Sequence, residues 1–106
     1  MENKKILGLL GLATKAGKVV FGTDSCMEAI NKRKVKLIIV ATDSAQRTKT
    51  NFELICKNKN VELIRVLTIE EISKSIGKEN KAVVGIKDVN FSKEITKIIN
   101  GGDIIG

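Results

Sequence analysis

The 106-residue chain is long enough for one domain with one hydrophobic core, and its 42% hydrophobic content excludes a disordered protein. Its formal net charge of +7 is unevenly distributed. Residues 1–60 hold 12 Lys and Arg against 5 Asp and Glu, whereas residues 61–106 hold 7 of each kind. A local excess of cations predicts a basic face that attracts polyanions such as nucleic acids. A surface that serves only solubility is the alternative that composition leaves open.

Cysteine usage and the N-terminus bear on where the protein works. Cys26 and Cys56 form no C-x-x-C pattern and the chain has no His, so no metal site is expected. Two isolated thiols in a Lys-rich chain are typical of a reducing cytoplasm, where each packs as a small hydrophobic side chain. Lys4-Lys5 and the apolar run 6–13 resemble a signal peptide, but the run is short and has helical spacing. Because no segment is long enough to span a membrane, we expect a cytoplasmic protein with no membrane partner.

Apolar spacing and turn residues predict five helices that alternate with four strands. Apolar residues recur at i, i+3, i+4 and i+7 from Ile6 to Ala13, which is typical of an amphipathic helix, and Gly17 is a typical stop. Leu37–Val40 is a continuous apolar run, which indicates a strand buried on both faces. The predicted helices cover about residues 6–16, 25–32, 45–59, 68–77 and 90–100, and the predicted strands cover about residues 19–21, 35–41, 61–66 and 82–86.

Three helix starts carry capping signals. Ser25 and Glu28 match the S-x-x-E capping box, and Thr68 and Glu71 match T-x-x-E. Asn90 is the predicted cap of the last helix, which Gly101-Gly102 would end, leaving the last four residues frayed.

Alternation at this spacing predicts an α/β fold, namely a three-layer α/β/α sandwich around a central sheet of about four strands. The sequence contains no internal repeat, linker or low-complexity segment. We therefore expect residues 1–106 to form a single domain.

The residues offer little for catalysis. Without His, the commonest general base is absent. Asp24 and Glu28 lie one helical turn apart, but carboxylates at a helix start are more often capping residues. The segment Gly11–Lys18 resembles a phosphate-binding loop, yet it has the wrong glycine spacing and Val19 stands where Ser or Thr is needed. We expect no enzymatic activity, no cofactor and no small-molecule substrate.

The strand–turn–helix junction at Phe21–Ser25 is the candidate polyanion site, because free backbone N–H groups at a helix start can hold a phosphate. Lys15 and Lys18 flank the same short strand, so we expect them to share a face with this junction. Lys32 to Lys36 lies at the other end of the second helix, about 15 Å away at 1.5 Å per residue. That run either contacts a second stretch of nucleic-acid backbone or only complements the helix dipole. With three Phe and no Tyr or Trp, an aromatic stacking platform is not expected.

An ordered series of stretches resembles the superfamily of kink-turn-binding large-subunit ribosomal proteins, and in particular its bacterial YlxQ-type members. The stretches are Gly11–Lys18, Gly22–Asp24, Lys36–Asp43, Ser75–Lys78 and Val83-Val84. The resemblance runs over roughly residues 6–100 and implies the same α/β/α sandwich. It also implies RNA binding without catalysis, by a protein associated with ribosomes or other ribonucleoproteins.

In that superfamily, the turn and start of the second helix contact the sheared G·A pairs of a kink-turn, and two further loops complete the site. The resemblance therefore implies contacts from Gly22 to Ser25, from the loop Asp43–Lys49, and from Val66 to Thr68. An exposed Val66 or Leu67 would cover an extruded base. Together with the lysines above, the candidate RNA-binding residues are Lys15, Lys18, Gly22, Thr23, Asp24, Ser25, Lys32, Arg47, Lys49, Val66, Leu67 and Thr68.

The chain departs from the superfamily pattern at three positions. Asp24 replaces an Asn, Ser25 replaces a Glu and Glu28 replaces a Lys. An ionised Asp only accepts hydrogen bonds, whereas Asn also donates them. Two hypotheses therefore stay open. The protein binds a structured, kink-turn-like RNA, with ribosomal proteins as further partners, or it is a protein-interaction module on the same fold whose RNA binding is weakened or lost.

Overall fold

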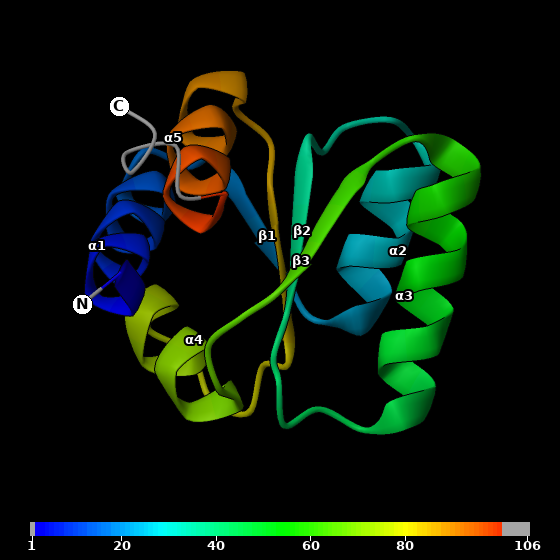
Figure 1. Ribbon diagram of the computed structural model, residues 1–106, viewed down its shortest axis with the longest axis horizontal. Coiled ribbons are helices and arrows are strands. Elements are labelled where there is room, and N and C mark those ends of the chain that lie inside the picture. Colours follow the sequence, from blue (N-terminus) through cyan, green and yellow to red (C-terminus); the bar gives the residue numbers. More distant parts are fainter. Residues whose placement is uncertain (1, 101–106) are drawn as a thin grey trace.

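A computed structural model describes residues 2–100 of the protein (Figure 1). Helices and strands alternate along the chain, as the sequence predicts. The helices are α1 (Glu2–Lys15), α2 (Thr23–Asn31), α3 (Gln46–Lys59), α4 (Ile69–Ile76) and α5 (Val89–Ile99), and the strands are β1 (Val19–Phe21), β2 (Leu37–Val40), β3 (Glu62–Arg65) and β4 (Val83–Ile86). Among the described helices, none is long and apolar enough to cross a lipid bilayer.

The four strands form one mixed sheet in the order β1-β4-β2-β3. β4 lies between β1 and β2 and is antiparallel to both, whereas β2 and β3 are parallel. It follows that β1, β2 and β3 all run in the same direction. The two central strands are fully buried, which confirms the prediction made from the apolar run Leu37–Val40.

Helices cover both faces of the sheet, as Figure 1 shows with α1, α4 and α5 on one side and α2 and α3 on the other. Alternate residues of β2 serve the two cores: Leu37 and Ile39 pack with the first group of helices, and Ile38 and Val40 with the second. The predicted three-layer α/β/α sandwich with a four-stranded sheet is therefore confirmed.

The predicted capping box at Ser25 is wrong. Gly22 occupies the N-cap position with φ 92° and ψ 155°, and the helix begins at Thr23. Because glycine tolerates this positive φ, the chain turns directly from β1 into α2, and Ser25 becomes the third helical residue. Glu28 consequently pairs with Lys32, with 2.8 Å between Oε2 and Nζ, instead of closing a box.

The starts of α4 and α5 also have predicted caps, of which one is correct. The capping box of Thr68 and Glu71 is confirmed, with each residue's side chain accepting from the other's backbone N–H. The predicted cap Asn90 is wrong, because Asp88 caps α5 through a 2.9 Å hydrogen bond that Oδ2 accepts from the Phe91 N–H. The predicted stop at Gly101-Gly102 and the last four residues lie outside the described part of the chain.

Gly85 is the most closely packed of the described glycines, and it lies on the sheet face covered by α2 and α3. A Cβ added there would lie 2.9 Å from Val20 Cγ2 and 3.0 Å from Val35 Cγ1. Both neighbours are β-branched and therefore stiff, so an added methyl group would have to displace them.

We therefore expect Gly85→Ala to lower the free energy of unfolding by about 1–3 kcal/mol, measured by urea denaturation. Gly8→Ala is the matched control. It lies in α1 with no atom within 4 Å of the added Cβ, so the better helix propensity should raise stability by roughly 0.8 kcal/mol. A stable Gly85→Ala variant would contradict the close packing of β4.

The two cysteines are buried and free, as predicted for core side chains. Burial raises the pKa of the Cys26 thiol from its ordinary 9.0 to about 12, with a further contribution from Cys56. Burial also raises the pKa of Cys56, to about 11. The folded state thus holds both thiols in the neutral form.

This burial predicts a loss of stability in alkali. The unfolded chain releases the thiol protons near pH 9 while the folded chain retains them, so the stabilisation is complete below pH 9 and is lost as pH rises toward 12. Urea titrations at pH 7, 9 and 10.5 measure the effect. The Cys26→Ala Cys56→Ala variant should lose less stability over this range than the wild-type chain, and an equal loss would assign the alkaline effect to other groups.

Candidate nucleic-acid interface

The strand directions bring the candidate loops to one end of the sheet. β1, β2 and β3 all finish there and β4 begins there. We call this the Gly22 end, which comprises residues 21–25, 41–49, 66–68 and 78–83. In open α/β sheets, the edge beyond the carboxyl ends of parallel strands is the usual place for ligands.

Backbone hydrogen bonds fasten the loops of the Gly22 end to one another. The N–H of Gly22 donates to the carbonyl of Val83 at 2.9 Å. The N–H of Thr42 donates to the carbonyl of Leu67 at 2.8 Å, and the Thr42 hydroxyl donates to the same oxygen at 3.0 Å. Segments separated by more than 60 residues in sequence, such as the Gly22 turn and the start of β4, are therefore held in fixed relative positions.

The start of α4 at this end is closed to ligands. Thr68 and Glu71 satisfy each other's backbone N–H groups, and Asp43 Oδ1 accepts from the Ile69 N–H at 2.9 Å. These acceptors come from two different loops. The first turn of α4 thus has few free donors to offer to a phosphate.

The starts of α2 and α3 are open by contrast. Gly22 caps α2 and Ala45 caps α3, and neither makes a side-chain cap hydrogen bond within the described residues. The first-turn N–H groups of a helix lack intrahelical acceptors and carry the positive end of the helix dipole. Residues 23–25 and 46–48 therefore present two sets of backbone donors at the same end of the sheet.

Two lysines of the α4–β4 loop frame the Gly22 turn, and sequence analysis did not select them. Lys78 Nζ lies 5.0 Å from the ring centroid of Phe21, and Lys81 Nζ lies 5.7 Å from it. A Cβ placed on Gly22 would lie 3.8 Å from Lys81 Nζ. The cluster of Phe21, Gly22, Lys78 and Lys81 thus puts two cations directly beside the open start of α2.

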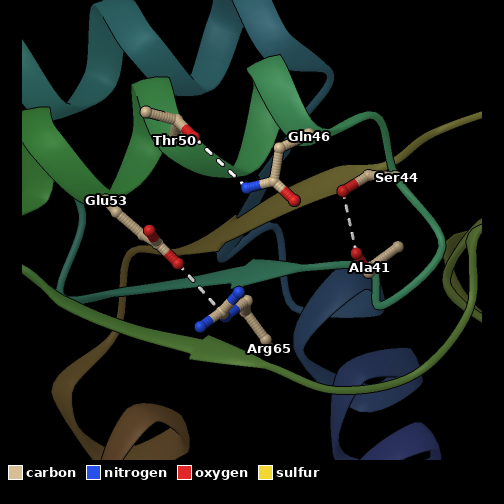
Figure 2. A network of polar contacts seen from close by, with 6 residues as sticks. All are labelled: Ala41, Ser44, Gln46, Thr50, Glu53 and Arg65. Atoms are coloured by element: carbon tan, nitrogen blue, oxygen red, sulfur yellow. Dashed lines mark hydrogen bonds and ion pairs between the residues drawn. The ribbon is translucent and has the colours of Figure 1, made fainter.

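Not every cation near this end is free. Figure 2 shows Arg65, at the end of β3, directed at Glu53 of α3, with 3.1 Å between Nε and Oε2. The same view shows Ser44 donating to the carbonyl of Ala41 at 2.8 Å, which braces the loop before α3. Arg47 is exposed and Lys49 is half-buried in the first turns of α3.

Two expectations about the candidate residues are wrong. Leu67 is only 2% exposed and packs in the core under α4, so it cannot cover an extruded base and only half-buried Val66 remains for that role. Lys18 precedes β1 and Gly22 follows it, so the two lie at opposite ends of the strand and do not share a face as expected.

Lys15 and Lys32 also lie away from the Gly22 turn. Lys15 lines a groove of about 580 Å³ between α1 and α4, together with Gly11, Leu12 and Lys74. Lys32 follows the last residue of α2 and donates a hydrogen bond to Glu28, which lowers the pKa of that carboxyl below its ordinary value. The candidate residues that the structure brings together are Gly22, Thr23, Asp24, Ser25, Arg47, Lys49, Val66 and Thr68.

The residues just described define a small α/β protein with a basic loop edge. The chain belongs to the Ribosomal protein L7Ae/L30e/S12e/Gadd45 family, whose sequence profile matches residues 4–96. It is 33% identical over 100 residues to the RNA-binding protein YlxQ of Enterococcus faecium, a match that covers 94% of this chain and 96% of that protein. The protein of the same name from Bacillus subtilis strain 168 is 30% identical over 100 residues, with 94% and 100% covered.

A solved structure has a similar fold. A protein with unknown function from Bacillus halodurans superposes with a TM-score of 0.87 at 29% identity, covering 91% of this chain and 97% of that one. The family and the similarity to YlxQ-type proteins, both expected from the sequence, are thus confirmed.

The link between Asp43 and α4 can be tested directly. Asp43→Ala removes the acceptor of the Ile69 N–H and should lower the free energy of unfolding by about 1–2 kcal/mol. Asp43→Asn keeps a side-chain oxygen and should lose less than half as much. Urea denaturation of the two variants gives the comparison, and equal losses would show that Asp43 acts through its charge alone.

Proposed function

We propose that this protein binds structured RNA of the kink-turn type at the Gly22 end of the sheet. The observation that carries the proposal is the open start of α2 with Lys78 and Lys81 beside it. Free N–H groups at a helix start, together with neighbouring ammonium groups, bind phosphate oxygens. Relatives at 33% and 30% identity over nearly the whole chain carry the name RNA-binding protein, which supports RNA as the polyanion.

In this proposal the three helix starts have different roles. The amides of residues 23–25 and 46–48 contact the RNA backbone and base edges, with Arg47 and Lys49 adding charge. The α4 start does not bind, because Thr68, Glu71 and Asp43 already occupy its donors. Val66 supplies the apolar contact to an extruded base, because Leu67 is buried.

The acidic departures from the family pattern are compatible with this role. Glu28 is exposed and its charge is paired with Lys32, so it is partly neutralised before RNA arrives. Asp24 lies in the first turn of α2, where the positive end of the helix dipole favours a carboxylate. Lys78 and Lys81 replace the cation that the resemblance implies at position 28, although they come from another loop.

The proposed role is binding rather than catalysis. Among the described residues, no group of three or more His, Cys, Asp or Glu side chains could hold a metal ion. The buried, neutral thiols of Cys26 and Cys56 are poor nucleophiles. We place the protein in the cytoplasm in association with ribosomal or other structured RNA, with ribosomal proteins as neighbours.

The proposal predicts that Lys78→Gln Lys81→Gln weakens binding of a kink-turn hairpin roughly tenfold or more at 150 mM salt. The magnitude of the slope of log K against log salt should fall by about 1.5, because each lost phosphate contact removes about 0.7–0.9. Fluorescence anisotropy at four salt concentrations measures both quantities.

Lys57→Gln Lys59→Gln is the charge-matched control, because both lysines lie in the last turn of α3, away from the Gly22 end. It should change binding less than threefold. A hairpin of equal length without the G·A pairs tests specificity. Equal affinity for the two hairpins, or equal losses in the two variants, would refute binding of kink-turn RNA at this end.

A further inference from the structure

Three lysines stand in one row at the opposite end of the sheet. The register pairs Val19 with Ile86 and Leu37 with Ile86, so the preceding and following residues continue the row as Lys18, Lys87 and Lys36. Two hydrogen bonds fix them: the Lys87 N–H donates to the Lys18 carbonyl, and the Lys36 N–H donates to the Ile86 carbonyl, both at 2.8 Å. We call Lys18, Lys87 and Lys36 the lysine row.

The lysine row is exposed and its charges are not paired. All three side chains are exposed. Among the described residues, the cations that form ion pairs are Lys32 and Arg65, and neither belongs to the row. Asp88 follows the row directly, but its carboxylate is engaged in capping α5. Like charges directly opposite on neighbouring strands destabilise a sheet, so an anion bound across the row would relieve their repulsion.

A hollow beside the row adds further cations. It has a volume of about 650 Å³ and lies between the start of β2 and α5, where Lys36, Lys93 and Lys97 line it. Two exposed carboxylates, Glu62 and Glu94, also line it, so this part of the surface is less basic than the row itself. The row therefore carries the more uniformly positive part of this surface, with the hollow beside it.

The lysine row and the Gly22 end are separated by the length of the sheet. Lys18 is opposite position 87 and Gly22 is bonded to position 83, which is four residues or ~13 Å along β4. The row itself crosses three strands and spans ~10 Å, a length that on the order of three phosphates of one strand can match. An RNA segment held at the Gly22 end thus leaves the row free for another segment.

We propose that the lysine row is a second RNA-backbone site, so that the protein joins two separate RNA segments. The row offers three cations and no aromatic side chain, so it contacts phosphates without reading sequence. This inference extends the proposed function, since it assumes that the Gly22 end is occupied by a structured RNA. It also gives Lys18 an RNA-binding role apart from the Gly22 turn.

The test uses the full chain saturated with a kink-turn hairpin, to which a labelled regular RNA duplex is added at 50 mM salt. The complex should bind the duplex, and Lys18→Gln Lys36→Gln Lys87→Gln should weaken that binding at least tenfold. The magnitude of the log–log salt slope should fall by about 2–3 for three lost contacts. A charge-matched control, Lys4→Gln Lys5→Gln Lys74→Gln on α1 and α4, should weaken duplex binding less than threefold.

Failure of this inference is distinguishable from failure of the proposed function. Hairpin affinity should be nearly unchanged in the lysine-row variant and reduced in Lys78→Gln Lys81→Gln. If the hairpin does not bind, the proposed function fails, and the duplex is then titrated onto the free protein to test the row alone. Absence of duplex binding, or equal weakening by the row and control variants, would overturn the second site and leave the row available to an acidic protein partner.

Discussion

The insertion of β4 between β1 and β2 determines where every candidate contact lies. Because β4 is antiparallel to both neighbours, β1, β2 and β3 finish at one end and begin at the other. At Gly85 the neighbouring side chains leave little room for an added methyl group, so β4 packs closely between its neighbours. One end of the sheet consequently gathers two open helix starts, and the other end gathers a row of lysines.

The helix starts at the Gly22 end differ in whether their backbone N–H groups are already hydrogen-bonded. The start of α4 is satisfied by Thr68, Glu71 and Asp43, and the bond from Asp43 also ties the loop before α3 to the start of α4. The starts of α2 and α3 lack such acceptors among the described side chains. In the proposed complex, a phosphate therefore meets donors in fixed positions. Binding then does not carry the entropic cost of ordering these loops.

Local signals in the sequence were sufficient for most of the fold. The apolar run at Leu37–Val40 and the capping box at Thr68 act over a few residues, and both predictions were correct. The sequence prediction misplaces the start of α2, because three residues that are good caps follow Gly22 whereas the N-cap is Gly22 itself, with its positive φ. The sequence prediction also misses Asp88, a good capping residue two positions before Asn90, which is the actual N-cap of α5.

Non-local contacts account for what the sequence could not predict about the site. Lys78 and Lys81 reach Phe21 only because β4 pairs with β1, and nothing in the local pattern indicates that pairing. The resemblance implies an exposed Val66 or Leu67, yet Leu67 adopts a positive φ of 71° and its side chain is buried in the core. The sequence does not predict the lysine row for the same reason, since its members are brought together only by strand pairing and are spread from position 18 to position 87.

The central claim is that the open starts of α2 and α3 hold the RNA, and chemical-shift mapping tests it most directly. The ¹⁵N-labelled protein is titrated with a kink-turn hairpin, and every assigned amide is followed. The account predicts large shifts for the amides of residues 23–25 and 46–48, with small shifts for those of 69–71 in α4. Shifts concentrated at the α4 start, or absent from both open helix starts, would contradict it.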